Sequence, residues 1–147
     1  MKSSVAALTF CFLVGCATQD LVAVSPAARF SDYPDDLFAA FEMSCAGPSR
    51  SFTQPNANLY ECREYMPPGA TAAAILEYDG HPEDLPQLVI RFRTSDLNPD
   101  VLVKAELFLN VPQKEGLPKR IAPADRRLTA KINRLFAAAG GTPVESE

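Results

Sequence analysis

The sequence predicts an α+β domain: an antiparallel sheet of four to five strands, with an N-terminal and a C-terminal helix packed on one face. Residues 87–93 and 100–111 alternate apolar and polar side chains, which is typical of half-buried strands. Residues 34–45 and 123–139 repeat apolar side chains at helical spacing instead. The two helical patterns enclose the strand patterns in the chain, so both helices are expected to cover the same sheet.

The first predicted helix runs from about Pro34 to Cys45. Asp32 is the expected N-cap, and a proline suits the first turn of a helix. The apolar residues of this segment form one stripe: Leu37, Phe38, Phe41 and Cys45. Gly47-Pro48 ends the helix.

The middle of the chain predicts strands. A short extended segment holds Tyr60 and Cys62, and Ala72 to Tyr78 is the next expected strand, although its alanines also suit a helical turn. The apolar residues are even-numbered in 87–93 and odd-numbered in 100–111. Antiparallel neighbours share a face, so a hairpin of these two strands needs an even loop, and residues 95–100 fit.

The outward side of this hairpin carries charges around apolar residues. These side chains are Val89, Arg91, Arg93, Leu102, Lys104, Glu106 and Phe108. They form a candidate contact surface, although an ordinary half-exposed sheet face has the same pattern.

The final helix begins near Pro123 and ends at Gly140-Gly141. Its apolar stripe is Leu128, Ile132, Leu135, Phe136 and Ala139. Candidate partner-binding residues are the cations Arg126, Arg127, Lys131 and Arg134, of which the last three share the opposite face. They suit another envelope protein, an anionic lipid or a cell-wall polymer, and the alternative is a solvated helix face.

The first residues have the layout of a secretory signal peptide. Lys2 precedes an apolar run from Val5 to Val14 that only Thr9 interrupts, and this run is too short to span a bilayer. Its end, Leu13-Val14-Gly15-Cys16, resembles the lipobox of bacterial lipoproteins.

The resemblance implies a diacylglycerol on the Cys16 thiol, cleavage before Cys16 and acylation of the new amine, for example with palmitate. The protein would then be lipid-anchored in the cell envelope and face the periplasm, and Ala17 favours the outer membrane over the inner. Cys11 would leave with the signal peptide. The alternative is an ordinary cut after Ala17, which would release a soluble periplasmic protein.

These patterns divide the chain into a signal peptide (1–15), a lipidated tether (16–30), a single α+β domain (31–141) and a disordered tail (142–147). With 14 basic and 18 acidic side chains, the net charge of −4 does not favour nucleic acid as a partner. Cys45 and Cys62 are the two cysteines that remain after Cys11 and Cys16. Because cysteine pairs of exported proteins become oxidised in the periplasm, we expect a disulfide between them. The chain has no Cys-x-x-Cys spacing that would favour a redox role.

Catalytic patterns are sparse. His81 is the only histidine, and no Gly-x-Ser-x-Gly surrounds a serine. Asp79, Glu83 and Asp84 accompany His81 in what reads as a solvated hairpin loop. The sequence thus predicts a membrane-tethered binding, accessory or assembly factor that is not an enzyme and uses no cofactor or metal. The alternatives are a soluble periplasmic binding or inhibitor protein, and a small hydrolase or metal-dependent enzyme that uses His81.

Overall fold

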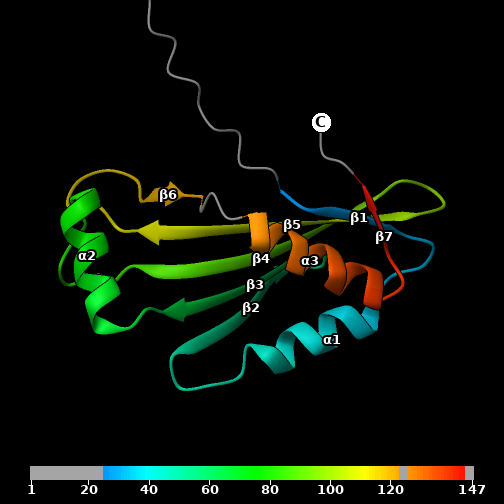
Figure 1. The fold of residues 1–147 in the computed structure, drawn as a ribbon, viewed down its shortest axis with the longest axis horizontal. Coiled ribbons are helices and arrows are strands. Elements are labelled where there is room, and N and C mark those ends of the chain that lie inside the picture. Colours follow the sequence, from blue (N-terminus) through cyan, green and yellow to red (C-terminus); the bar gives the residue numbers. More distant parts are fainter. Residues whose placement is uncertain (1–24, 123–125, 145–147) are drawn as a thin grey trace, which may run out of the picture.

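The computed structural model describes residues 25–122 and 126–144, which form an α+β fold with one antiparallel seven-stranded sheet and three helices (Figure 1). The strand order is β2-β3-β4-β5-β1-β7, and β6 pairs with the same edge of β5 as β1. The strands are β1 (Ala27–Phe30), β2 (Arg50–Asn56), β3 (Leu59–Tyr65), β4 (Gln87–Asp96), β5 (Val101–Val111), β6 (Lys119–Ile121) and β7 (Thr142–Val144). The helices are α1 (Asp35–Ser44), α2 (Pro68–Tyr78) and α3 (Arg126–Ala138). The sheet is therefore larger than the four to five strands that the sequence predicts.

Strands β4 and β5 form the central hairpin. Asp96 pairs with Val101, so the loop holds the four residues 97–100, which is shorter than predicted but even as predicted. The even-numbered residues of β4 face the odd-numbered residues of β5, with Phe92 opposite Ala105. This register places both apolar sets on one face of the sheet, as the alternation predicts.

The predicted strand at Ala72–Tyr78 is wrong, because these residues belong to helix α2. Pro68 lies in the first turn and four alanines follow it, and alanine has the highest helix propensity. The helix ends at Asp79, which is left-handed (φ 55°), and Gly80 then donates its N–H to the carbonyl of Ile75 at 2.8 Å. The segment around His81 consequently joins a helix to β4 and is not the loop of a hairpin.

The two predicted helices are present with shifted starts. Helix α1 begins at Asp35 after Pro34, and no side chain caps it, so Asp32 is not the N-cap. The hydroxyl of Ser31 donates to the Asp32 carboxylate instead, at 3.3 Å. Helix α3 begins at Arg126, and the predicted start at Pro123 lies outside the described residues.

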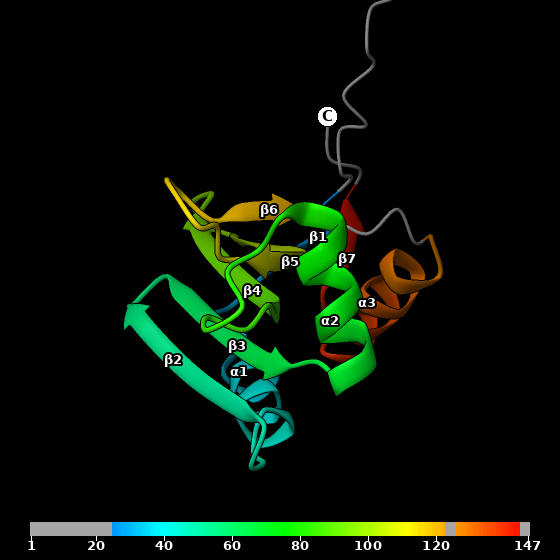
Figure 2. The same cartoon turned by 90° about the vertical axis from the view of Figure 1, so that its left-hand side faces the viewer.

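The core is centred on Phe92 of β4, which is 1 % exposed. Its ring lies 4.6 Å from that of Phe41 in α1 and 5.7 Å from that of Phe136 in α3. Phe38 of α1 also stacks on Tyr60 of β3, with ring centroids 4.0 Å apart. Helices α1 and α3 therefore both pack on the sheet face that carries Phe92. At the far end of this face lies α2 (Figures 1 and 2), where a Cβ on Gly80 would approach Val111 to 2.9 Å.

The sheet includes residues on both sides of the predicted 31–141 domain. Strand β1 covers the end of the predicted tether, and β7 covers the start of the predicted tail. They pair with each other, and β1 also pairs with β5. Gly141 precedes β7 and lies against the ring of Phe30, where a Cβ would meet two ring carbons at 2.8 Å.

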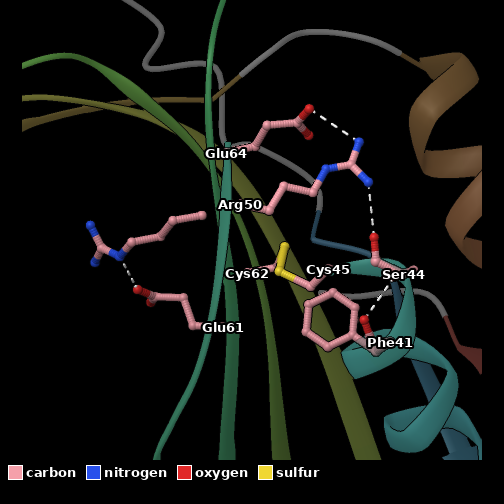
Figure 3. Close-up of a disulfide and its surroundings, with 8 residues drawn as sticks. Phe41, Ser44, Cys45, Arg50, Glu61, Cys62 and Glu64 are labelled. Carbon is pink, nitrogen blue, oxygen red and sulfur yellow. Dashed lines mark hydrogen bonds and ion pairs between the residues drawn. A yellow bond between two sulfur atoms is a disulfide. The ribbon is translucent and has the colours of Figure 1, made fainter. Parts of the chain in front are cut away.

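The predicted disulfide between Cys45 and Cys62 is confirmed, and it joins the end of α1 to β3 (Figure 3). Both cysteines are buried. Beside it, Arg50 of β2 donates to the Ser44 carbonyl at 2.9 Å and to the Glu64 carboxylate at 3.1 Å. These contacts hold the turn after α1 against the edge of the sheet.

Candidate functional site

The sheet face opposite the helices is the main candidate site, and we call it the open face. Figures 1 and 2 show α1, α2 and α3 together on the other face. Alternation along the paired strands places these larger side chains on the open face: Arg29, Glu61, Arg63, Val89, Arg91, Arg93, Leu102, Lys104, Glu106, Phe108 and Arg120. Six of them are cations and two are carboxylates, although the whole chain has a net charge of −4.

A buried ion pair between Glu61 and Arg91 crosses β3 and β4 in register. Glu61 is 4 % exposed and Arg91 is 8 % exposed. Two guanidinium nitrogens of Arg91 donate to Glu61 Oε2, at 2.6 and 2.8 Å, and Arg63 Nε donates to Glu61 Oε1 at 2.6 Å. Glu106 of β5 accepts a longer bond of 3.3 Å from Arg91. Figure 3 shows Glu61 on the opposite side of β3 from the disulfide.

The surroundings of Glu61 change its pKa in two opposing ways. Burial raises the pKa, while the hydrogen bonds from Arg91 and Arg63 and their positive charges lower it. The arginines prevail, and the pKa lies below its usual range. Glu61 is therefore a carboxylate at neutral pH and the counter-ion of Arg91. Its Oε2 already accepts two hydrogen bonds from Arg91.

Phe108 lies at the apolar centre of the open face between two arginines. The guanidinium carbons of Arg91 and Arg120 are each 5.0 Å from its ring centroid, a cation–π arrangement. Val89 lies between Phe108 and Arg63 in register and is fully buried, although none of the three described helices covers this face. Long arginine side chains can cover apolar surface in this way while their charged ends stay in water.

A second group of cations on the open face is not neutralised. Arg93 of β4 and Lys104 of β5 are directly opposite each other, and both are exposed. Within residues 25–122 and 126–144, neither makes an ion pair. Arg29 lies diagonally beyond Lys104, and its contact with Asp100 is loose at 3.7 Å. Like charges directly opposite in a sheet repel each other.

The predicted basic surface on α3 lies elsewhere. Arg127, Lys131 and Arg134 are exposed, on the side of α3 away from the buried Phe136. The side chain of Arg126 lies outside the described residues. The α3 cations and the open-face cations thus belong to separate surfaces on the two sides of the sheet.

His81, the residue of the enzymatic alternative, lies in the segment that joins α2 to β4. The imidazole Nδ1 of His81 accepts the backbone N–H of Glu83 at 3.2 Å. The backbone N–H of His81 donates to the Pro112 carbonyl at 2.8 Å. Asp79 pairs with Lys114 at 2.6 Å. Among the described residues there is no group of three or more side chains arranged to hold a metal ion.

A cleft of about 390 Å³ lies where the β1–α1 loop meets the end of α3. Asp32, Asp35 and Asp36 are among its lining residues. Tyr33, also in the lining, has its hydroxyl 2.6 Å from that of Tyr60, and burial with this bond raises the pKa of Tyr33. The lining of the cleft thus offers three carboxylates, the Ser31 hydroxyl and a neutral phenol, and it includes no cation.

The alternation along β4 and β5 predicts Arg91, Arg93, Lys104 and Glu106 on the open face, and the structure places them there. Glu61 was not predicted as a member of this face. The signal was present: Glu61 alternates with the apolar Tyr60 and Cys62, which places it on the outward side of the strand. Its pairing with Arg91 depends on the register between β3 and β4, which no local pattern specifies.

No family model, curated protein or solved structure matches this chain. Within the described part of the chain, no helix is long and apolar enough to cross a membrane.

Proposed function

We propose that this protein is a lipid-anchored lipoprotein of the bacterial envelope that works by binding, as an accessory or assembly factor, and not by catalysis. The anchor would be Cys16, on the lipobox resemblance of Leu13 to Cys16. The buried Cys45–Cys62 disulfide supports an oxidising compartment such as the periplasm. Ala17 supports the outer membrane as the destination.

One observation carries the binding role: the open face presents a surplus of cations in an acidic chain. Phe108 and Val89 are buried on this face, whereas Arg93 and Lys104 are exposed cations without an ion pair among the described residues. A surface of one charge sign attracts partners of the other sign and directs their approach. The open face is thus the first candidate contact surface, and the basic side of α3 is the second.

A photo-activatable cross-linking residue can test the two surfaces in intact cells. It is placed at Arg93 on the open face, at Lys131 on α3 and, as a control, at Leu76, which is 84 % exposed on α2. We expect specific adducts from the Arg93 position and none from Leu76. Adducts from Lys131 alone would transfer the role to α3, and anchored protein without adducts at either site would contradict the proposal.

The enzymatic alternative is tested separately with His81→Ala. Because His81 is the only histidine, a histidine-dependent hydrolase would lose its function in this variant. We expect the variant to complement a deletion strain as well as the wild type does. A null phenotype with normal protein level would favour the enzyme.

A further inference from the structure

The exposed cation group of the open face is only partly balanced by carboxylates of the described residues. Arg93 and Lys104 are side by side across β4 and β5, and Arg29 of β1 lies diagonally beyond Lys104. All three are exposed. The Asp100 carboxylate is 3.7 Å from Arg29 Nε, and Glu106, two residues after Lys104 on the same face, pairs with Arg91. Adjacent cations at the strand spacing of about 4.8 Å repel each other, and an anion between them removes that cost.

The chain enters the sheet beside these cations. Ala27 is the first residue of β1 and is directly opposite Lys104, and the Pro26 carbonyl accepts the N–H of Ala105 at 2.8 Å. Pro26 is ten positions after Cys16 in the chain. Even fully extended, ten residues span at most about 35 Å. A lipid on Cys16 would therefore keep Lys104 within roughly 40 Å of the membrane headgroups.

We propose that the open face docks on the anionic phospholipids of the membrane that anchors the protein, with Arg29, Arg93 and Lys104 contacting headgroup phosphates. This inference rests on the proposed lipid anchor at Cys16. The cations form an exposed row across neighbouring strands, outside the cleft beside α1, which suits several phosphates in a plane better than one enclosed ligand. The anchor makes the encounter intramolecular, so modest attraction is sufficient.

The native lysines allow a direct test, because Lys104 is on the open face and Lys131 is on α3. The protein is extracted with detergent from its own envelope and reconstituted in vesicles of phosphatidylcholine, alone or with one third phosphatidylglycerol. Lysine acetylation rates are then measured by mass spectrometry. We expect Lys104 to react several-fold more slowly on the anionic vesicles, at low salt only, while Lys131 reacts at the same rate on both.

Flotation of the same samples separates the two hypotheses. Protein that does not float with phosphatidylcholine vesicles has no lipid anchor, and the proposed function then fails. Protein that floats but shows equal Lys104 rates on both vesicles refutes the docking. Protection of Lys131 in place of Lys104 also refutes the docking. Protection of Lys104 in native envelopes but not on vesicles refutes it as well, and would indicate an acidic protein partner.

Matched charge variants complete the test. Each cation near an anionic surface contributes about a fivefold preference for it. Arg93→Gln should therefore reduce the protection of Lys104 by up to about fivefold, whereas Arg134→Gln, the same change on α3, should leave it unchanged. Equal effects of the two variants would mean that net charge and not the open face is responsible, and would overturn the inference.

Discussion

The ion pair between Glu61 and Arg91 gives the sharpest stability prediction. In Glu61→Gln the carboxylate becomes a neutral amide of the same shape. Arg91 loses the negative charge that it contacts at 2.6 and 2.8 Å, and the one amide oxygen can no longer serve both Arg91 and Arg63 as two oxygens do. Removing one partner of a buried pair costs about 3–5 kcal/mol, because the other charge stays buried. Arg91 keeps Glu106 at 3.3 Å and the ring of Phe108, so we expect the lower end, about 3 kcal/mol.

The chain contains a matched control on the same strand. Glu64 also pairs with an arginine, Arg50, at 3.1 Å, but the two side chains are 36 % and 39 % exposed. Exposed pairs contribute at most about 1 kcal/mol, so Glu64→Gln should change the stability little. The assay is urea unfolding with the disulfide intact, and the midpoints are compared at unchanged slope. Equal losses in the two variants would show that burial does not set the strength of the Glu61–Arg91 pair.

Replacing both members of the pair tests the reason for the loss. In the double variant Glu61→Leu with Arg91→Leu, no charge is left buried. Apolar pairs in place of buried ion pairs are often neutral or stabilising, so the double variant should be more stable than Glu61→Gln. A double variant less stable than the single one would contradict this explanation.

Three further predictions concern the fold. Replacing both Cys45 and Cys62 by alanine should lower the free energy of unfolding by about 3 kcal/mol, the chain-entropy value for this loop, and reduction of the wild type should give the same midpoint shift. Because the pKa of Glu61 is lowered in the fold, its contribution is full above its unfolded pKa of about 4.3 and is lost as the pH falls through the lower folded value. The difference in free energy of unfolding between the wild type and Glu61→Gln should therefore become smaller in urea titrations at acidic pH. A difference that grows at acidic pH would mean that the fold raises the pKa of Glu61, which contradicts this prediction. Gly141→Ala should destabilise the protein by about 1–3 kcal/mol by thermal unfolding, since its Cβ would overlap a phenylalanine ring of β1, whereas Gly69→Ala, in open space on α2, should not destabilise it.

The periodicity of apolar residues predicted the elements whose buried face repeats along the sequence. The alternation along β4 and β5 specified both their shared face and the even hairpin loop, because a shift by one residue would expose every apolar side chain. The apolar stripes specified α1 and α3 in the same way, and Phe41 and Phe136 do face Phe92. Within the candidate site, the outward charges of β4 and β5 followed from the same alternation.

The failures concern short or ambiguous segments. Residues 72–78 contain β-formers as well as alanines, and the helix depends on the preceding Pro67-Pro68 and on packing against β5. Strands β1, β6 and β7 have three or four residues each, too few for a period, and only pairing defines them. Glu61 was missed as the counter-ion of Arg91 because the two are 30 residues apart in the sequence.

The most direct test of the account is the intact mass of the protein extracted with detergent from its native envelope, measured before and after reduction. We predict a chain that begins at Cys16, carries the mass of its acyl groups and gains two hydrogens on reduction. A chain that begins at Thr18 without acyl mass would contradict the anchor, and with it both the proposed function and the docking of the open face on the membrane.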